Sequence, residues 1–166
     1  MNYYGKITNA ANAPQYILLF VCSGNTCRSP MAEALTRAWL DSHIPDHAGR
    51  FRVMSAGLAA RPGSSVSEGA AEAVTRHGCM LEGHRARAFT PEMARGAQVI
   101  AMTRSHAAIA KSAAPGAKVT TLAAWAGQNG GWDILDPFMG SDAEYRACCD
   151  QIGRLIDLGL RRMLNM

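Results

Sequence analysis

A short stretch of the sequence, FVCSGNTCRSP over residues 20–30, combines residue types that together can bind a tetrahedral anion. Cys22 ends an apolar run, Gly24 and Asn25 follow it, and Pro30 suits the first position of a helix. The residues between them must form a loop whose backbone N–H groups can converge on one point, in front of a helix N-terminus. Gly24 supplies backbone freedom and Asn25 tolerates a left-handed conformation. The spacing therefore predicts a phosphate-binding loop.

Cys22 is the residue of this loop that can act as a nucleophile. Converging amides, a helix N-terminus and the guanidinium of Arg28 all favour the thiolate, so we expect Cys22 to be ionised at neutral pH. The planar fork of Arg28 fits two oxygens of a phosphoryl group and of its transition state. Ser29 can donate a hydrogen bond to the sulfur and help it leave in a second step. The loop therefore predicts attack on phosphorus through a covalent intermediate on cysteine.

This chemistry also needs a general acid, and Asp136 is the best-placed carboxyl group of the sequence. It lies in the glycine-rich segment 123–141, where Pro137 stiffens the chain after it and Asp133 is the only other carboxylate. An Asp-Pro turn without a catalytic role is the simpler alternative. We predict that Asp136 protonates the leaving atom and then, as a carboxylate, activates water against the cysteinyl-phosphate.

Four apolar runs predict the strands that must position these groups. They are residues 16–22, 51–57, 98–103 and 118–122. Helical patterns run from Pro30 to about Ser42, from Ser67 to Gly78, from Ser105 to about Ala114, and along an amphipathic tail from about 145 to 163. Strands that alternate with helices predict a parallel sheet with helices on both faces. Ligands bind such a sheet at the carboxyl ends of its strands, where Cys22 and the segment 123–141 both fall.

The chain reads as one domain. We find no internal repeat and no second domain, so residues 16–166 are expected to form a single unit, preceded by a loosely held leader over residues 1–15. The segment 123–141 has no clear periodicity, and structureless loops of this length in a compact domain are usually functional.

Composition and charge restrict the class of protein. At 166 residues, with 48% hydrophobic and 18% charged residues, the chain has the composition of a globular domain. The net charge is +4 and the arginines are scattered, so neither nucleic acid nor a membrane is expected as a partner, although a basic surface attracts anionic substrates. No stretch resembles a secretory signal or a membrane span. The five cysteines, an odd number, then predict free thiols in a reducing cytoplasm.

The residues singled out so far resemble those of the low-molecular-weight protein tyrosine phosphatases. The likeness runs from about Tyr16 to the last helix and includes CRSPMAEA, SAG, GHRAR and DPF. It implies Cys22 as the nucleophile, Arg28 as the phosphate clamp and Asp136 as the general acid, acting on a phosphorylated protein side chain without metal or cofactor. The implied fold is an α/β three-layer sandwich, in which helices flank both faces of a four-stranded parallel sheet with the order 2-1-3-4.

The resemblance also implies supporting roles. The phosphate-binding loop would hold inorganic phosphate or a similar oxyanion and comprises Ser23, Gly24, Asn25, Thr26, Cys27 and Arg28. The residues expected to support this loop are Asn25, Ser29, Ser55 and His84. Cys27 would protect Cys22 by a reversible disulfide, or would simply pack. The Cys22–Cys27 pair lacks a matching downstream pair at zinc-finger spacing, so no structural zinc is expected.

Thr26 bears on which phosphoryl group is removed. Tyrosine-directed members usually carry a bulkier aliphatic residue there, often Ile, whereas GNTCRSP resembles the bacterial protein-arginine phosphatases of the same superfamily. A hydroxyl can satisfy a guanidinium at the pocket floor, while a branched hydrocarbon packs better on a phenyl ring. Tyrosine-directed members tend to have aromatic residues directly after Asp-Pro, whereas here only Phe138 is aromatic and Met139 follows it. Arg61, expected on the opposite pocket wall, would repel a guanidinium, so phosphoarginine is favoured and phosphotyrosine stays the alternative.

Two other classes of function are open. Arsenate reduction on the same fold requires further cysteines in relay, but Cys79 stands alone and the vicinal Cys148 and Cys149 lie in the tail. A non-catalytic phosphate-binding module would lack the nucleophile or the acid, and the sequence has both Cys22 and Asp136. A structural core cysteine at the end of the first strand is disfavoured, since Arg-Ser-Pro follows the loop directly.

Overall fold

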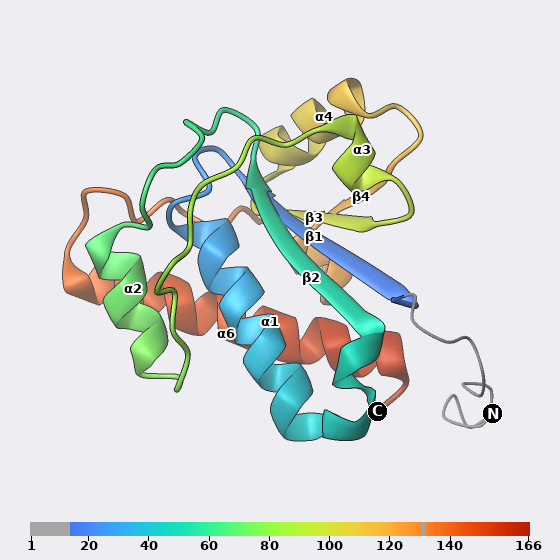
Figure 1. The fold of residues 1–166 in the computed structure, drawn as a ribbon, viewed down its shortest axis with the longest axis horizontal. Helices are drawn as coiled ribbons and strands as arrows, with labels where there is room; N and C mark the ends of the chain where they lie inside the picture. The colour runs from blue at the N-terminus through green and yellow to red at the C-terminus, as the bar shows by residue number, and fades with distance from the viewer. Residues whose placement is uncertain (1–13, 131) are drawn as a thin grey trace.

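The computed structural model describes residues 14–130 and 132–166, so most of the expected leader, residues 1–13, lies outside the described range. In chain order the elements are β1 (Tyr16–Cys22), α1 (Arg28–His43), the 3₁₀ helix η2 (Pro45–Arg50), β2 (Phe51–Gly57), α2 (Glu68–Thr75), α3 (Pro91–Ala94), β3 (Gln98–Ala101), α4 (Arg104–Ala113), β4 (Lys118–Thr121), α5 (Leu122–Trp125) and α6 (Asp142–Leu164). The strands form one parallel sheet in the order β2-β1-β3-β4 (Figure 1). This order confirms the predicted α/β fold.

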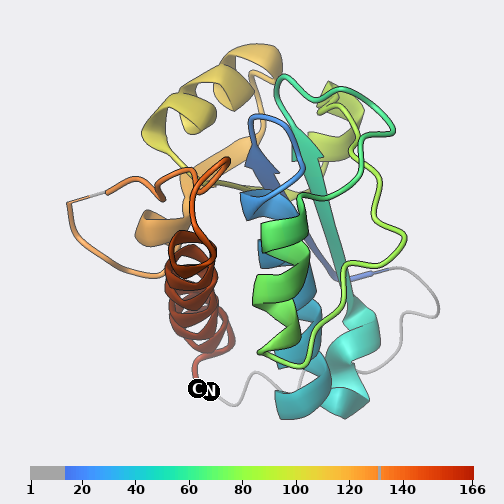
Figure 2. The ribbon, with the colours of Figure 1, turned by 90° about the vertical axis from the view of Figure 1, so that its left-hand side faces the viewer.

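The central strand β1 is apolar throughout because helices cover both of its faces. Leu18 and Phe20 pack in a core with α1, α2 and α6, whereas Leu19 and Val21 pack with α3 and α4. Successive side chains of a strand point to opposite faces, so a strand between two helical layers must be apolar at every position. Figures 1 and 2 show the resulting three layers, with α1, α2 and α6 on one side of the sheet and α3 and α4 on the other.

The register of the sheet brings the carboxyl ends of the strands to one edge. Cys22 pairs with Gly57, Val21 with Ala101, and Ala101 with Thr121. The segments that follow the strands therefore leave the sheet side by side. The loop after Cys22, the chain after Gly57 and the first turn of α4 meet at this edge, where ligand sites of open α/β sheets lie.

Helix α1 begins earlier than the sequence analysis predicts. Its N-cap is Cys27, and the carbonyl of Cys27 accepts the Met31 N–H at 3.1 Å. Pro30 therefore lies within the first turn, where its missing N–H removes no helical hydrogen bond. The consequence is that Arg28 and Ser29 belong to the helix, and the free loop is shorter than expected.

The prediction that the segment 123–141 lacks regular structure is wrong at its start. The short helix α5 begins at Leu122, where Thr121 Oγ1 caps it by accepting the Ala124 N–H at 3.2 Å. Further along, Ile134 fastens the segment to the sheet, because its N–H donates to the Met102 carbonyl at 3.0 Å and its side chain is buried. The stretch that carries Asp136 is thus anchored just before the proposed acid.

Smaller differences concern the ends of the other elements. Strands β3 and β4 stop at Ala101 and Thr121, helix α2 stops at Thr75, and helix α4 is displaced by one residue because Thr103 Oγ1 caps it. The elements η2 and α3 are not part of the prediction. Helix α6 covers the amphipathic tail and starts with a capping box between Ser141 and Glu144. Within the described residues, none of the helices has the length and apolar character that a membrane span requires.

Candidate active site

Asn25 is the structural centre of the loop between β1 and α1. It is fully buried and has a positive φ of 56°, a conformation that Asn adopts more readily than most residues. Its Nδ2 donates to Ser29 Oγ and to Ser55 Oγ, both at 2.9 Å, and its Oδ1 accepts the Arg87 N–H at 3.0 Å. One side chain therefore ties the loop to helix α1, strand β2 and the chain around residue 87.

Gly57, at the end of β2, lets the loop approach the sheet closely. A Cβ atom at this position would lie 2.6 Å from the Ser23 carbonyl oxygen and 3.0 Å from the Asn25 nitrogen, so a larger residue would displace the loop. The two residues after Gly57 hold the same backbone: Leu58 and Ala59 donate to the carbonyls of Cys22 and Ser23, both at 2.9 Å.

The carbonyl groups of the loop point toward the surrounding protein. In addition to the contacts of Leu58 and Ala59, His84 Nε2 donates to the Asn25 carbonyl at 3.0 Å, and the Ser67 N–H donates to the Thr26 carbonyl at 2.9 Å. The C=O of one residue and the N–H of the next point in opposite directions across a trans peptide bond, and the described chain contains no cis bond. The amides that follow these carbonyls therefore face the inside of the loop.

The amide N–H groups of residues 23–28 donate no hydrogen bond within the described part of the chain. Buried backbone N–H groups are almost always paired, so a run of unpaired amides at one loop is a specific feature. Together with the N-terminus of α1 it forms a concave array of donors, which is the structure that binds tetrahedral anions.

Cys22 lies at the start of this array. Its Sγ is 2.9 Å from Ser29 Oγ, and Ser29 Oγ already accepts a hydrogen bond from Asn25 Nδ2. The hydroxyl hydrogen of Ser29 is therefore available for the sulfur, since Ser29's only other acceptor, the Ala56 carbonyl, is 3.5 Å away. A hydroxyl that donates to sulfur stabilises the thiolate, the form of cysteine that acts as a nucleophile.

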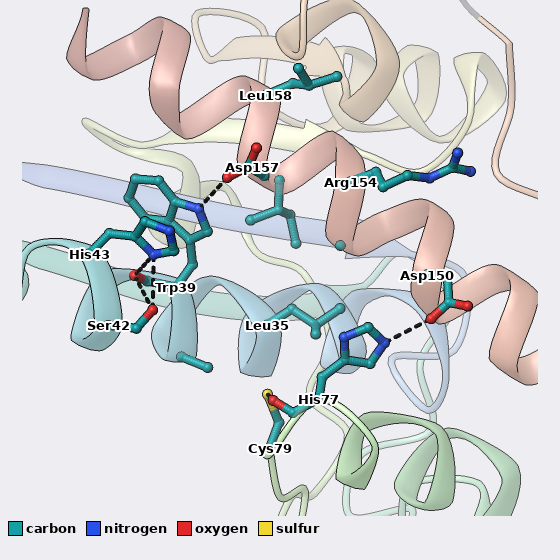
Figure 3. Close-up of a pocket in the computed structure, with 13 residues that line it drawn as sticks. Leu35, Trp39, Ser42, His43, His77, Cys79, Asp150, Arg154, Asp157 and Leu158 are labelled. Atoms are coloured by element: carbon teal, nitrogen blue, oxygen red, sulfur yellow. Dashed lines mark hydrogen bonds and ion pairs between the residues drawn. The ribbon is translucent and has the colours of Figure 1, made fainter. Parts of the chain in front are cut away.

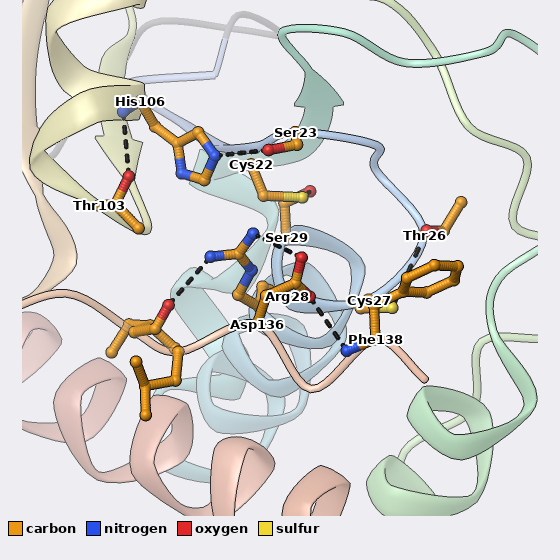
Figure 4. A network of polar contacts seen from close by, with 12 residues as sticks. Cys22, Ser23, Thr26, Cys27, Arg28, Ser29, Thr103, His106, Asp136 and Phe138 are labelled. Carbon is orange, nitrogen blue, oxygen red and sulfur yellow. Dashed lines mark hydrogen bonds and ion pairs between the residues drawn. The ribbon is translucent and has the colours of Figure 1, made fainter. Parts of the chain in front are cut away.

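Arg28 brings a buried guanidinium to the same place (Figure 4). Its Nη1 donates to the Ile134 carbonyl at 2.9 Å, and its Nη2 lies 3.2 Å from Asp136 Oδ2. Its Nε has no hydrogen-bond partner in the described structure, although this atom is buried. The Ile134 contact fixes the orientation of the fork, and the Nε–H of Arg28 stays unused.

Of the two carboxylates in the long segment, Asp136 is the one that reaches the loop. It is half exposed, pairs with Arg28, and accepts the Phe138 N–H at 3.2 Å. Asp133 instead caps helix α4, where it accepts the Arg104 N–H at 2.9 Å. That hydrogen bond is the main reason that the pKa of Asp133 lies below its usual value. Asp133 is thus engaged with helix α4, and Asp136 is the carboxylate that contacts Arg28.

The expected pocket residues lie around this centre. Thr26 is half-buried, and its Oγ1 lies 3.9 Å from Cys27 Sγ, a long contact that leaves the hydroxyl free for another partner. Phe138 is 61% exposed, two residues beyond Asp136, and Arg61 is exposed in the segment after β2. The places of Phe138 and Arg61 in a substrate pocket remain predictions.

Cys27 is free in the structure, as is Cys22. Its Sγ lies 3.0 Å from Ser67 Oγ and 3.8 Å from Tyr145 OH. Ser67 is at the N-cap position of α2, as predicted, but its hydroxyl contacts Cys27 instead of capping the helix. The redox role of Cys27 stays a prediction.

Two residues at the site are absent from the sequence analysis. Glu33 Oε2 accepts the Ser55 hydroxyl at 2.6 Å and so extends the chain of contacts that starts at Cys22. Glu33 lies one helical turn after Ser29, so helical spacing could have predicted that it faces the same side of α1. His106, on the first turn of α4, has Nε2 2.8 Å from Ser23 Oγ. Only the rule that ligand sites gather at the carboxyl ends of strands points toward it.

A large cavity lies away from this site, between helices α1 and α6 (Figure 3). It has a volume of about 840 Å³, and its lining includes Trp39, His43, His77, Asp150 and Asp157. Trp39 and Asp157 are joined across it by a hydrogen bond of 2.8 Å. This cavity contains none of the residues that converge on Cys22.

Fold and site together define a class of protein: an α/β sandwich with a cysteine and an arginine around a loop of unpaired backbone amides after its first strand. The family model described as low molecular weight phosphotyrosine protein phosphatase matches residues 17–162. The chain therefore belongs to this family of protein phosphatases.

Three comparisons illustrate its relatives. The protein-arginine-phosphatase of Bacillus subtilis is 37% identical over 84% of this chain and 91% of its own length. The solved structure of YwlE arginine phosphatase, a cysteine-to-serine variant with a phosphorylated active-site serine, has a TM-score of 0.80 at 34% identity and covers 90% of this chain and 95% of its own. The tyrosine phosphatase Wzb from Escherichia coli K30, solved with sulphate, has a TM-score of 0.76 at 27% identity and covers 89% and 97%.

Proposed function

We propose that this phosphatase hydrolyses phosphorylated protein side chains through a cysteinyl-phosphate on Cys22, and that phosphoarginine is its preferred substrate. The observation that carries the chemistry is the set of unpaired donors at the loop, namely the amides of residues 23–28 and Arg28 Nε. These donors fit a tetrahedral oxyanion beside a sulfur atom. The related phosphatase Wzb was solved in complex with sulphate, which supports an oxyanion as the ligand.

In the first step the Cys22 thiolate attacks phosphorus, and the bond from phosphorus to the side-chain nitrogen or oxygen breaks. Asp136 gives a proton to the leaving atom. The loop amides and Arg28 stabilise the oxygens of the phosphoryl group in the transition state. A bound phosphoryl group also competes for Arg28, which Asp136 contacts at 3.2 Å in the structure. This competition frees the carboxyl group to carry the proton.

In the second step Asp136, now a carboxylate, takes a proton from water as the water attacks phosphorus. The sulfur–phosphorus bond breaks, inorganic phosphate forms, and the thiolate of Cys22 is regenerated. Ser29, 2.9 Å from the sulfur, donates a hydrogen bond to the departing thiolate. The two steps together consume one water molecule and involve no oxidation or reduction.

Thr26 supports phosphoarginine as the substrate. Its hydroxyl lies beside Gly24, where a Cβ atom would be 3.5 Å from Thr26 Oγ1, and it makes only a long contact with Cys27. A free hydroxyl in the loop can satisfy the N–H groups of a guanidinium, which an aliphatic side chain cannot. The names of the arginine phosphatases among the relatives agree with this assignment. Phosphotyrosine is the alternative, which Arg61 favours.

The buried thiols of the tail support hydrolysis over a cysteine relay for arsenate. Burial raises the pKa of both Cys148 and Cys149 to about 12. Both side chains therefore remain protonated thiols at neutral pH and are poor nucleophiles. All five cysteines are free in the structure, which supports a reducing cytoplasm as the site of action.

Two peptides of the same sequence, one with phosphoarginine and one with phosphotyrosine, test the substrate proposal. We expect the wild type to have the higher kcat/KM on phosphoarginine, and Thr26→Ile to shift the ratio toward phosphotyrosine by about 10-fold or more. Thr26→Ser keeps the hydroxyl and is the matched control, with the preference retained. An unchanged ratio in Thr26→Ile would remove the main reason for phosphoarginine.

A further inference from the structure

His106 is a buried histidine at the edge of the active-site loop, and its contact is with Ser23, the residue that follows the nucleophile. The side chain of His106 is 7% exposed, and its Nε2 lies 2.8 Å from Ser23 Oγ (Figure 4). Helix α4 holds it there, since Thr103 Oγ1 caps the helix by accepting the His106 N–H at 3.0 Å. The catalytic steps described above make no use of either side chain.

The surroundings of His106 keep its imidazole neutral. Burial lowers the pKa of His106, and the positive charge of Arg28 lowers it further, while Asp136 and Asp133 act in the opposite direction. A neutral imidazole has one N–H and one unprotonated nitrogen. The direction of the hydrogen bond to Ser23 therefore depends on which of its two nitrogens holds the proton.

The partners of the two nitrogens decide this question. Nδ1 of His106 is buried and has no hydrogen-bond partner within the described residues. A proton on Nδ1 would make a buried N–H group without an acceptor, and this group would lie in the electric field of the Arg28 cation. A proton on Nε2 has an acceptor in Ser23 Oγ. The Nε2–H form is favoured on both grounds, so His106 donates and Ser23 accepts.

This direction has a consequence for Ser23. Because its oxygen accepts from His106, its own hydroxyl hydrogen is free for another acceptor. Ser23 is an exposed residue of the loop, adjacent to Cys22, whereas its backbone is fixed by the bond from Ala59 N–H to the Ser23 carbonyl at 2.9 Å. The hydroxyl of this exposed residue therefore adds a donor to a loop whose other unpaired donors include the backbone amides and Arg28 Nε.

We propose that Ser23 is a binding residue for the phosphoryl group, with its hydroxyl donating to the bound oxyanion, and that His106 is a positioning residue that orients this hydroxyl. The pair adds one side-chain donor to the amides and the guanidinium of the loop. It acts on phosphate itself, so it is independent of whether the substrate carries phosphoarginine or phosphotyrosine.

Competitive inhibition by inorganic phosphate, with p-nitrophenyl phosphate as the substrate, tests this proposal. Loss of a hydrogen bond to a charged group weakens binding by about 10-fold, so we expect the Ki for phosphate to rise about 10-fold in Ser23→Ala and to stay near the wild-type value in Ser23→Thr. An unchanged Ki in Ser23→Ala would overturn the proposal. These two variants change an exposed side chain, so they test it even if the histidine variants fold poorly.

The role of His106 is tested by a double-mutant cycle and by rescue. His106→Leu should raise the Ki in the wild-type background and change it little in the Ser23→Ala background, because the two residues act as one unit. His106→Gln, which can place an amide N–H near the position of Nε2, should recover most of the loss. Equal losses in both backgrounds, or no recovery in His106→Gln, would reduce His106 to a packing residue. His77→Gln, in the distant cavity between α1 and α6, is the control and should leave the Ki unchanged.

Discussion

Replacement of Asn25 is the perturbation for which the structure gives the clearest magnitude. Asn25→Ala removes three side-chain hydrogen bonds from a fully buried position, those to Ser29, Ser55 and Arg87. At about 1 kcal/mol for each bond this amounts to about 3 kcal/mol of unfolding free energy. The φ of 56° adds about 1 kcal/mol for Ala, which adopts this conformation poorly. We therefore expect Asn25→Ala to lower the unfolding free energy by about 4 kcal/mol.

Asn25→Gly separates these two contributions, because Gly loses the same hydrogen bonds but adopts the positive φ without strain. We expect Gly to be about 1 kcal/mol less destabilising than Ala at this position. Urea unfolding followed by fluorescence gives the free energies. Under folding conditions kcat/KM should fall by about 100-fold in both variants, since small displacements of a catalytic loop are costly. Asn129→Ala, an exposed asparagine in the long segment, is the control. An Asn25→Ala variant as stable and active as the control would refute the role of Asn25.

Three further predictions follow from individual groups of the structure. Asp136→Asn should lower kcat/KM, which reports the steps up to transfer of the phosphoryl group to Cys22, by about 100-fold or more on peptide substrates, whose leaving groups need a proton, and much less on p-nitrophenyl phosphate; equal losses of kcat/KM on both would contradict the acid role. The pKa of His106 is lowered in the folded protein, so below about pH 6.5 the unfolded chain binds more protons than the folded one. The unfolding free energy should therefore fall with falling pH until His106 is protonated in the folded protein as well. In urea unfolding from pH 7 to 5 this fall should be smaller in His106→Gln than in the wild type, and equal falls would contradict the prediction. The pKa values of Cys148 and Cys149 are raised to about 12, so both thiols should resist iodoacetamide in the native protein at pH 8 and react after unfolding in urea. Peptide mass spectrometry measures the labelling, and rapid labelling of the native protein would contradict their burial.

The parts of the fold that could be predicted from the sequence are those with a single physical cause. Strands β1 and β2 have the predicted bounds, Tyr16–Cys22 and Phe51–Gly57, because each is a run of apolar residues that ends at a turn. The start of α1 could not be located in the same way. Pro30 is tolerated anywhere in the first turn of a helix, so its presence did not distinguish the first helical position from the third.

The site shows the same division. Cys22, Arg28 and Ser29 could be placed because they are close in sequence and their residue types state their chemistry. Contacts that depend on tertiary packing could not be predicted from the sequence. The Ile134 carbonyl that orients Arg28, at 2.9 Å, comes from a segment more than a hundred residues away, and a backbone acceptor leaves no trace in residue type. The contact between His106 and Ser23 could not be predicted either, because the two residues are far apart in sequence. The register of β1 with β3 brings their segments together.

The anchoring of the loop explains how a small domain can hold a reactive group. The loop carbonyls are bonded to the surrounding protein, which turns the amides inward, and Asn25 and Gly57 set the path of the backbone. The site that we propose for the oxyanion is therefore formed without a ligand. Such preorganisation lowers the cost of stabilising charge in the transition state.

The central claim is that Cys22 carries the phosphoryl group during turnover. Rapid acid quenching of the enzyme during turnover of p-nitrophenyl phosphate, followed by peptide mass spectrometry, measures this directly. The account predicts a phosphoryl group on the sulfur of the peptide that contains Cys22, which accumulates further in Asp136→Asn because water is not activated. Turnover should be lost in Cys22→Ser, whether or not its serine accepts a phosphoryl group. Turnover that continues in Cys22→Ser, or an active enzyme that never shows a phosphorylated Cys22 peptide, would contradict it.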